Sequence, residues 1–363
     1  MKAFEYYSLT KIIFGEGSIK EIGNLLPKGS NKIIVVTGKH SSKANGSLEI
    51  LKTLLKSKEL WVFDEIEENP SGYTVNMGAD LSRKKKVDLV IGLGGGSAID
   101  AAKCIALLTT NDGVIENYLN ENNSPINPSV PIIAIPTTAG TGSEVTHHVV
   151  VTVGSTKKGY SNNEFFPKIA ILDPSLTISM PREITVNTGI DALTHAIEGY
   201  LSLRANPISD LIALETIKII KEWLPKVVMN GKDIEARSQM LYASMLGGMV
   251  ITQTGTIILH ALGYPITTFY GIPHGRINGA LLPWVLEFLK DMERKRINEI
   301  TQIIGEVTNF LANLGVSIKL RDYKVIETDI PRFVQDVWGK RNLTITPKPV
   351  TQKDIENIYR QAL

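Results

Sequence analysis

The sequence has a single cysteine, Cys104, among its 363 residues, so no intrachain disulfide can form. So little cysteine is typical of a reducing compartment. The 39 basic and 37 acidic residues leave a formal net charge of +2, which gives no electrostatic reason to expect binding to nucleic acid or to a membrane surface. Apolar runs stay shorter than the roughly 20 residues that cross a bilayer, and the N-terminal residues lack the apolar core of a signal peptide. We therefore expect a soluble, cytoplasmic protein.

Short β-branched runs alternate with helical segments in the first half of the chain. The runs are residues 33–36, 60–63, 88–91, 132–135, 149–153 and 169–172. Between them, residues 46–57 and 75–86 carry apolar side chains at helical spacing. This alternation predicts an α/β domain whose parallel sheet is covered by helices on both faces.

The pattern changes after Met180 and Pro181. Strand-like runs nearly disappear, and long amphipathic segments such as residues 209–226 take over. We therefore expect two domains: a dinucleotide-binding α/β domain (1–181) and an all-helical, metal-binding domain (182–363). The cleft between two such domains is where we expect a ligand.

A glycine-rich turn follows the strand-like run that ends near Ile91. Gly92, Gly94, Gly95 and Gly96 lead into Ser97 and a helical segment. Glycines let the backbone approach a ligand, and the N-terminus of the next helix favours a pyrophosphate, to which Ser97 can add a hydroxyl donor. The turn matches neither the dinucleotide fingerprint in its usual first-strand place nor a Walker A motif. The alternative is a tight turn without a ligand.

A second polar loop follows the run at 132–135. It carries two glycines and four hydroxyl side chains, those of Thr137, Thr138, Thr141 and Ser143. The carboxyl ends of parallel strands are where α/β sheets bind ligands. The alternative is a polar loop whose hydroxyls only cap the local backbone.

The helical half contains a candidate metal site. Asp191 and His195 are four residues apart, so a helix projects both from one face. His260 and His274 would be about 21 Å apart on one continuous helix. We expect Gly263, Pro265, Gly271 and Pro273 to break that helix and let the chain turn back.

One carboxylate and three imidazoles suit a borderline divalent ion such as Fe(II), Zn(II) or Ni(II). The alternative is that these histidines are separate core residues with ordinary hydrogen bonds. Two other histidines, His147 and His148, are better explained as an exposed pair or a cleft wall, and Cys104 as a packing residue.

These residues resemble the iron-containing (group III) alcohol dehydrogenase family from residue 14 to about residue 283. The matching motifs are Phe14-Gly15-Glu16-Gly17, Gly94-Gly95-Gly96-Ser97 with Asp100 and Lys103, Pro136-Thr137-Thr138 with Gly142-Ser143-Glu144, Leu172-Asp173-Pro174, Gly189 and Asp191 to Ala196 with Glu198, and Pro273-His274-Gly275. Many long motifs in the family's order make the resemblance specific.

The resemblance implies a Rossmann-like N-terminal domain, a helical C-terminal domain, and a homodimer or larger assembly that binds NAD or NADP beside iron. It makes Asp191, His195, His260 and His274 the metal ligands. Gly96, Ser97, Thr137 and Thr138 match the family's nucleotide contacts, joined by Asn69 and Lys158. We extend the candidate cofactor site to Gly94, Gly95, Asp100, Thr141 and Ser143, which belong to the same motifs or, for Thr141, to the loop that joins two of them.

Two positions of this chain bear on proton transfer and on cofactor choice. Many family members carry a proton-relaying histidine where this chain has Tyr264, whose ordinary pKa of about 10 suits a relay less well. NAD-preferring members carry an aspartate where this chain has Gly38, and that acid would repel a 2′-phosphate. The glycine, with Ser41, Ser42, Lys39 and Lys43 as nearby donors and charges, therefore predicts a preference for NADP over NAD.

We thus expect a metal-dependent alcohol dehydrogenase that transfers a hydride between a small alcohol or aldehyde and NAD(P). The alternatives are a glycerol dehydrogenase-like zinc enzyme or a dehydroquinate synthase-like lyase on the same scaffold, and a nucleotide-binding protein without catalysis. Asp191 together with His195 favours the iron type. The sequence does not specify the substrate.

Overall fold

The computed structural model describes residues 3–119, 124–154 and 156–363. Its residues form two compact units, Ser8–Met180 and Pro181–Leu363, and residues 3–7 belong with the second. The side-chain amide of Gln253 donates to the Tyr7 carbonyl at 2.7 Å, which attaches this N-terminal segment to the helical unit. The sequence predicts these few residues in the α/β half, because nothing in their pattern indicates an attachment to the helical half.

The first unit contains a six-stranded sheet in the order β1-β8-β5-β4-β2-β3. All neighbouring strands are parallel, as the alternation of strands and helices predicts. The strands are β1 (Lys11–Phe14), β2 (Lys32–Gly38), β3 (Glu59–Ile66), β4 (Leu89–Gly94), β5 (Ile132–Pro136) and β8 (Ile169–Leu172). A separate antiparallel hairpin pairs β6 (His148–Val153) with β7 (Thr156–Ser161).

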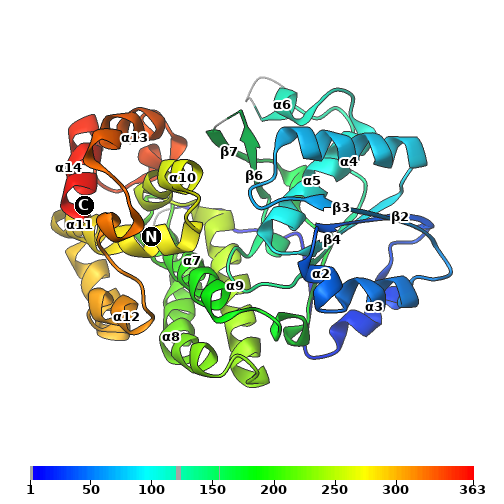
Figure 1. Ribbon diagram of the computed structural model, residues 1–363, viewed down its shortest axis with the longest axis horizontal. Helices are drawn as coiled ribbons and strands as arrows, with labels where there is room; N and C mark the ends of the chain where they lie inside the picture. Colours follow the sequence, from blue (N-terminus) through cyan, green and yellow to red (C-terminus); the bar gives the residue numbers. More distant parts are fainter. Residues whose placement is uncertain (1–2, 120–123, 155) are drawn as a thin grey trace. The chain divides into compact units, whose positions relative to one another are not determined.

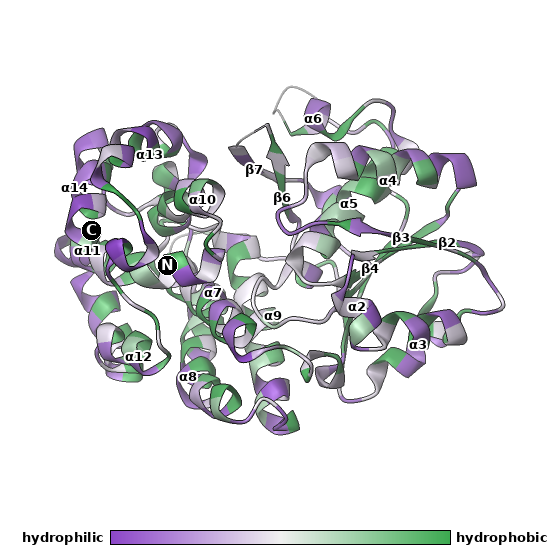
Figure 2. Cartoon of the chain, viewed as in Figure 1, coloured by the Kyte–Doolittle hydropathy of each residue, from purple (hydrophilic) through white to green (hydrophobic). Residues whose placement is uncertain are grey.

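Helices cover both faces of this sheet, with α2 and α3 on one side and α4 and α5 on the other (Figure 1). The helices of the unit are α1 (Ile22–Leu25), α2 (Ser41–Ala44), α3 (Ser47–Leu54), α4 (Gly72–Lys85), α5 (Gly96–Thr110) and α6 (Ile115–Tyr118). Figure 2 shows hydrophobic and hydrophilic residues on each of α3 and α4, as expected for helices with one face on a sheet.

The two faces of β2 show how the sequence builds the two cores. Ile33 and Val35 pack with Leu48 and Leu51 of α3, whereas Val36 faces the opposite core around α5. Successive side chains of a strand alternate between faces, so an uninterrupted apolar run serves both.

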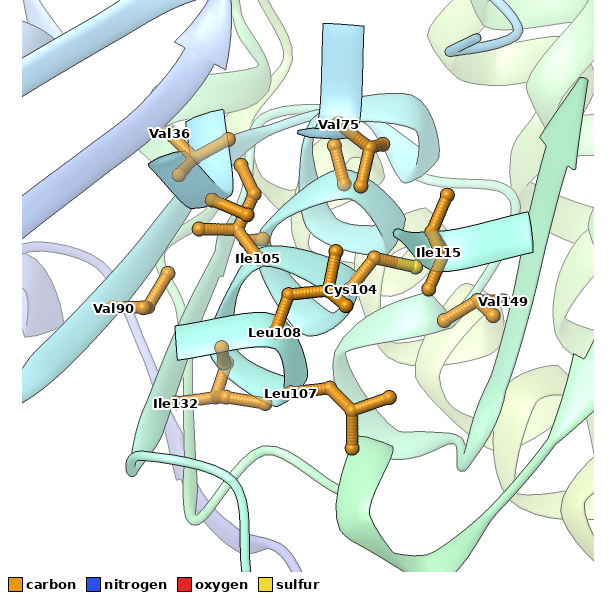
Figure 3. Packing of buried hydrophobic residues seen from close by; sticks show 14 of the residues in the cluster. Val36, Val75, Val90, Cys104, Ile105, Leu107, Leu108, Ile115, Ile132 and Val149 are labelled. Carbon is orange, nitrogen blue, oxygen red and sulfur yellow. The ribbon is translucent and has the colours of Figure 1, made fainter. Parts of the chain in front are cut away.

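Helix α5 lies at the centre of the second of these cores (Figure 3). Cys104 and Leu108 of α5 pack among side chains that include Val75 and Val149. Cys104 is fully buried, as expected for a packing residue. This packing fixes the position of the α5 N-terminus at the end of β4.

The second unit is helical. Its helices are α7 (Arg182–Leu201), α8 (Pro207–Met229), α9 (Ile234–Thr254), α10 (Ile258–Tyr270), α11 (His274–Ile304), α12 (Val307–Asn313), α13 (Ile330–Val337) and α14 (Gln352–Ala362). Helix α7 packs against α8, α9 and α11, and nearly every residue from Thr185 onward is buried. A helix buried on all sides can hold polar side chains only where they find partners.

Helices α9 and α10 meet at an angle of 112°. Taken together the two helices have the length and apolar composition of a bent membrane span, but in the described part of the chain no single helix is long and apolar enough to cross a membrane. The sharp bend directs α10 toward α7, and α10 carries one of the candidate metal ligands.

Candidate functional site

Helix α7 presents a stripe of polar side chains to the interior of the helical unit. Asp191, His195 and Glu198 follow one another at spacings of four and three residues, so they share one face of the helix. Their exposed fractions are 7%, 5% and 1%. The stripe therefore lies in the protein interior.

Helix α10 brings His260 to this stripe. Its Nε2 lies 3.7 Å from Asp191 Oδ1, and its ring stacks on that of His195 with centroids 4.7 Å apart. One ligand atom from each of Asp191, His195 and His260 lies within 4.8 Å of the others. Three residues from two helices can therefore share one ion.

His274, the first residue of α11, lies beside this cluster. Its ring stands edge-on to that of His260 at 5.1 Å. The Asn278 amide nitrogen lies 3.1 Å from His274 Nε2, and Thr267 Oγ1 lies 3.3 Å from Nδ1. The structure thus places the fourth predicted ligand next to the other three, outside the group whose ligand atoms all lie within 4.8 Å of one another.

The turn between His260 and His274 differs from the expectation. Helix α10 runs through Gly263 and Pro265 and ends only at Tyr270, where Gly271 adopts a left-handed conformation with φ of 67°. Neither internal residue breaks the helix, because the packing of α10 outweighs their poor helix propensity. Gly263 serves another purpose, since a Cβ there would lie 2.2 Å from Asn278 Oδ1.

The chemistry of the cluster fits a metal ion. Among the described residues, the buried atoms Asp191 Oδ1 and His260 Nε2 have no hydrogen-bond partner. Each such atom costs about 1–3 kcal/mol if it stays unsatisfied. A divalent ion would satisfy both, and a carboxylate with imidazoles suits Fe(II), Zn(II) or Ni(II).

Glu198 supports the far side of the His260 ring. Its carboxylate contacts His260 Nδ1 and accepts the backbone N–H of His260 at 3.3 Å. Burial lowers the pKa of His260, but the carboxylates of Glu198 and Asp191 outweigh this effect and raise the pKa above its usual value. Sequence reasoning gave Glu198 no role, although its place seven residues after Asp191 puts it on the same helix face.

Tyr264 lies one helical turn after His260. Its ring stacks on that of His274, with centroids 5.0 Å apart and planes 7° from parallel. The ammonium group of Lys340 lies 5.3 Å from the centre of the same ring and pairs with Asp336 at 3.2 Å. The residue in the relay position is therefore near the cluster and close to a charged pair.

In the α/β unit, the glycine turn and the threonine loop pack together. Gly94 ends β4, Gly95 is the N-cap of α5, and the Thr137 amide donates to the Gly94 carbonyl at 2.9 Å. A Cβ on Gly96 would lie 2.7 Å from the methyl carbon of Thr141, and one on Gly95 would lie 3.3 Å from Thr138 Oγ1. A side chain at Gly96 would therefore displace Thr141, and one at Gly95 would press on Thr138.

Ser97 and Asn69 also meet at this turn. Ser97 Oγ accepts the backbone N–H of Asn69 at 3.2 Å, and Thr152 Oγ1 donates to the Asn69 carbonyl at 3.1 Å. Asn69 has a positive φ of 58°, a conformation that non-glycine residues hold only when their surroundings fix it. Strained residues of this kind are concentrated at functional sites.

Asp100 and Ser143 belong to a buried network beneath the loop. Ser143 Oγ donates to Asp100 Oδ1 at 2.5 Å, and Asp100 Oδ2 accepts the Val150 amide at 2.9 Å. The fully buried ammonium of Lys103 donates to Ser143 Oγ and to the His148 carbonyl, both at 2.8 Å. These bonds tie α5 to the threonine loop and to β6.

The histidines after the loop are not an exposed pair. His147 is buried and packs against Phe166 at a ring distance of 5.1 Å, and His148 Nδ1 lies 2.7 Å from Ser161 Oγ. The burial of His147 and the partial burial of His148 are not evident from the dipeptide alone. Lys158 lies on β7, opposite Val151 of β6.

The residues at and after the end of β2 form hydrogen bonds and ion pairs within the α/β unit. Ser42 is fully buried and accepts a hydrogen bond from Thr37 Oγ1 at 2.7 Å, whereas Ser41 is exposed at the start of α2. Two acidic residues of β3 pair with the nearby lysines, Glu65 with Lys39 and Asp64 with Lys43. Gly38 itself has room, since a Cβ there would be 3.5 Å from its nearest neighbour.

Comparison with known proteins gives matches along nearly the whole chain. The family model described as iron-containing alcohol dehydrogenase matches residues 10–174, and the model described as Fe-containing alcohol dehydrogenase family, C-terminal, matches residues 185–363. The NAD-dependent methanol dehydrogenase of Bacillus methanolicus is 32% identical over 97% of both chains. The long-chain-alcohol dehydrogenase 1 of Geobacillus thermodenitrificans is 35% identical, covering 92% of this chain and 90% of its own.

Solved structures agree with the sequence matches. The crystal structure of an iron-containing alcohol dehydrogenase from Thermotoga maritima has a TM-score of 0.93 and 42% sequence identity, and the match covers 99% of both chains.

Proposed function

Because the chain belongs to the iron-containing alcohol dehydrogenase family, we propose that its helical unit holds the catalytic metal ion and its α/β unit holds the nicotinamide cofactor. The chain is an oxidoreductase that acts with NAD(H) and a metal on small alcohols or aldehydes. These matches do not favour the alternative functions, namely a glycerol dehydrogenase-like enzyme, a lyase or a non-catalytic protein.

The proposed ligands of the ion, with iron(II) the first candidate, are Asp191, His195, His260 and His274. The cluster of buried ligand atoms from the first three carries this proposal. His274 joins them if its ring turns Nε2 away from Asn278. A divalent ion bound here supplies a Lewis acid that lowers the pKa of an alcohol or polarises a carbonyl.

The chain's own side chains exclude water from the site and move a proton. The buried walls formed by α7 and α10 keep bulk water from the polar stripe, which strengthens electrostatic interactions there. We propose that Tyr264 carries a proton between the substrate oxygen and solvent, since its phenol is next to His274. A phenol can donate and accept a proton, although its ordinary pKa of about 10 makes it slow at neutral pH.

For the cofactor, we propose that the α5 N-terminus receives the pyrophosphate at Gly95, Gly96 and Ser97. Free backbone N–H groups and the helix dipole favour an anion there. The loop residues Thr137, Thr138 and Thr141 then hold the nicotinamide half for hydride transfer. We propose that Asn69, whose backbone N–H is bonded to Ser97, and Lys158 of β7 also contribute to this site, while Asp100 and Ser143 stabilise the loop.

We further propose that the enzyme prefers NADP(H). Gly38 leaves space where an acid would repel a 2′-phosphate, and Ser41 is exposed nearby. Lys39 and Lys43 would have to exchange their acidic partners for the phosphate. The hydroxyl of Ser42 is already bonded to Thr37, so its contribution would be to the shape of the turn.

We also propose a homodimer or a larger assembly in the cytoplasm. The family supports the assembly. The single, buried cysteine supports a reducing compartment. Light scattering on the purified protein measures the assembly directly.

Metal removal tests the central proposal. Chelation should abolish alcohol oxidation, and Fe(II) added under anaerobic conditions, or Zn(II) or Ni(II), should restore it. His274→Ala removes one of four ligands and should lower metal occupancy sharply while the fold survives. The exposed variant Lys290→Ala on the same helix is the control and should keep full occupancy. Full activity in a preparation shown to be metal-free would contradict the proposal.

A further inference from the structure

Glu198 is buried more completely than the candidate ligands around it, with only 1% of its surface exposed. Burying a carboxylate is costly unless it is paired and hydrogen-bonded. Its partners are the Nδ1 and the backbone N–H of His260 and the backbone N–H of Ile257, the residue before α10. The side-chain partner of the carboxylate is therefore the His260 ring.

The two contacts with His260 restrict its ring in two ways. The backbone contact places Glu198 at the start of α10, and the Nδ1 contact stops the ring from rotating. A neutral imidazole that donates Nδ1–H to a carboxylate must keep the lone pair on Nε2. That Nε2 lies 3.7 Å from Asp191 Oδ1, in the cluster.

Charge supplies a reason for a carboxylate rather than an amide at this position. With a divalent cation bound, the carboxylates of Asp191 and Glu198 would supply two negative charges to balance the two positive charges of the ion. A carboxylate behind a ligating histidine also makes the imidazole a stronger donor. A purely structural contact between α7 and α10 would need neither effect.

We propose that Glu198 is a positioning residue of the metal centre, which fixes the orientation and tautomer of His260 and thereby raises the affinity for a divalent ion. This inference rests on the proposed function, because it assumes that the cluster binds metal. Glu198 itself stays behind the ring and does not touch the ion.

The test compares Glu198→Gln and Glu198→Ala with the wild type, using Zn(II) and Co(II) alone as probes. Glutamine keeps one acceptor oxygen for the Nδ1–H but lacks the charge and the second acceptor, whereas alanine loses both contacts. We expect Zn(II) affinity, measured by competition with a chromophoric chelator, to fall 10–100-fold in the glutamine variant, the usual cost of losing such a partner, and at least as far in the alanine variant. The Co(II) absorption bands should change in position or intensity.

Two controls separate this effect from a loss of folding. Glu222→Gln replaces an exposed carboxylate on α8 and should leave metal affinity unchanged. The circular dichroism and melting temperature of the metal-free glutamine variant should stay close to those of the wild type. Equal Zn(II) affinity in this variant and the wild type would overturn the inference.

A second measurement does not depend on any variant. Two-bond ¹H–¹⁵N correlation spectra of the wild type report the tautomer of each histidine, and we expect His260 to be protonated at Nδ1. Protonation at Nε2 instead would overturn the inference. If the wild type takes up no ion, the proposed function fails, and the His260 tautomer still decides whether Glu198 orients the ring.

Discussion

At the scale of the residue, Tyr264 is the position where this chain departs from many members of its family. Its phenol stacks on His274, so a side chain here is close enough to exchange protons near the cluster. We expect Tyr264→His to add a group that titrates near pH 6.5 to the pH dependence of kcat. The affinity for the cofactor should change much less. Steady-state rates from pH 5 to 10 check this, with Tyr264→Phe as the control without a titrating group.

An unchanged pH profile in the histidine variant would place residue 264 outside the proton path. Loss of activity in both variants at all pH values would point to packing against His274 instead.

Glu144 is the second residue with a measurable consequence. It is 1% exposed, its Oε1 has no hydrogen-bond partner among the described residues, and burial raises its pKa from 4.5 to about 7. The folded state therefore favours the protonated acid. Its contribution to stability is complete below about pH 4.5 and is lost as the pH rises through about 7.

Glu144→Gln should remove this dependence. The difference in free energy of unfolding, variant minus wild type, should rise by on the order of 1–3 kcal/mol from pH 5 to pH 7.5. Melting temperatures at the two pH values measure the gain, and Glu49→Gln, an exposed acid on α3, should show none. The range stays below pH 8 because burial lowers the pKa of Lys103 to about 8. Parallel curves for variant and wild type would contradict the assignment.

At the scale of the element, the turn after β2 bears on cofactor choice. A side chain at Gly38 meets its nearest neighbour, the Ile66 carbonyl, at an ordinary 3.5 Å, so Gly38→Asp can be accommodated. We expect this variant to lose at least about tenfold more kcat/KM with NADPH than with NADH, because the carboxylate repels the 2′-phosphate. Gly38→Ala fills the space without charge and is the matched control.

The wild type itself decides the underlying preference. A higher kcat/KM with NADH than with NADPH would show that the pairs Lys39–Glu65 and Lys43–Asp64 hold the lysines back from a phosphate.

The elements also show what the sequence can and cannot predict. The apolar runs of β2, β4 and β5 predict the sheet, because buried parallel strands are apolar on both faces. The short edge strand β1 and the polar strand β7 do not stand out, since one has four residues and the other is held by its hairpin partner.

Local sequence likewise predicts some of the candidate metal ligands and not the placement of others. Asp191 and His195 follow from helical spacing within α7, a local property. The arrival of His260 depends on the 112° bend between α9 and α10, and no local pattern contains that angle. The orientation of His274 depends on Asn278, whose close approach requires a glycine at position 263 on another helix.

At the scale of the whole molecule, the lone thiol of Cys104 has a practical consequence. It lies fully buried on α5, in the core of the α/β unit, so a thiol reagent can reach it only when that unit opens. The rate of labelling by a chromogenic disulfide reagent therefore reports the rate at which this unit opens, and no probe has to be introduced. We expect labelling in the native protein to be far slower than in denaturant. Saturating cofactor should slow it further, because the cofactor binds the folded α/β unit and not the opened one. Cofactor that left the rate unchanged would mean that it binds elsewhere or that the thiol becomes accessible through a smaller, local fluctuation.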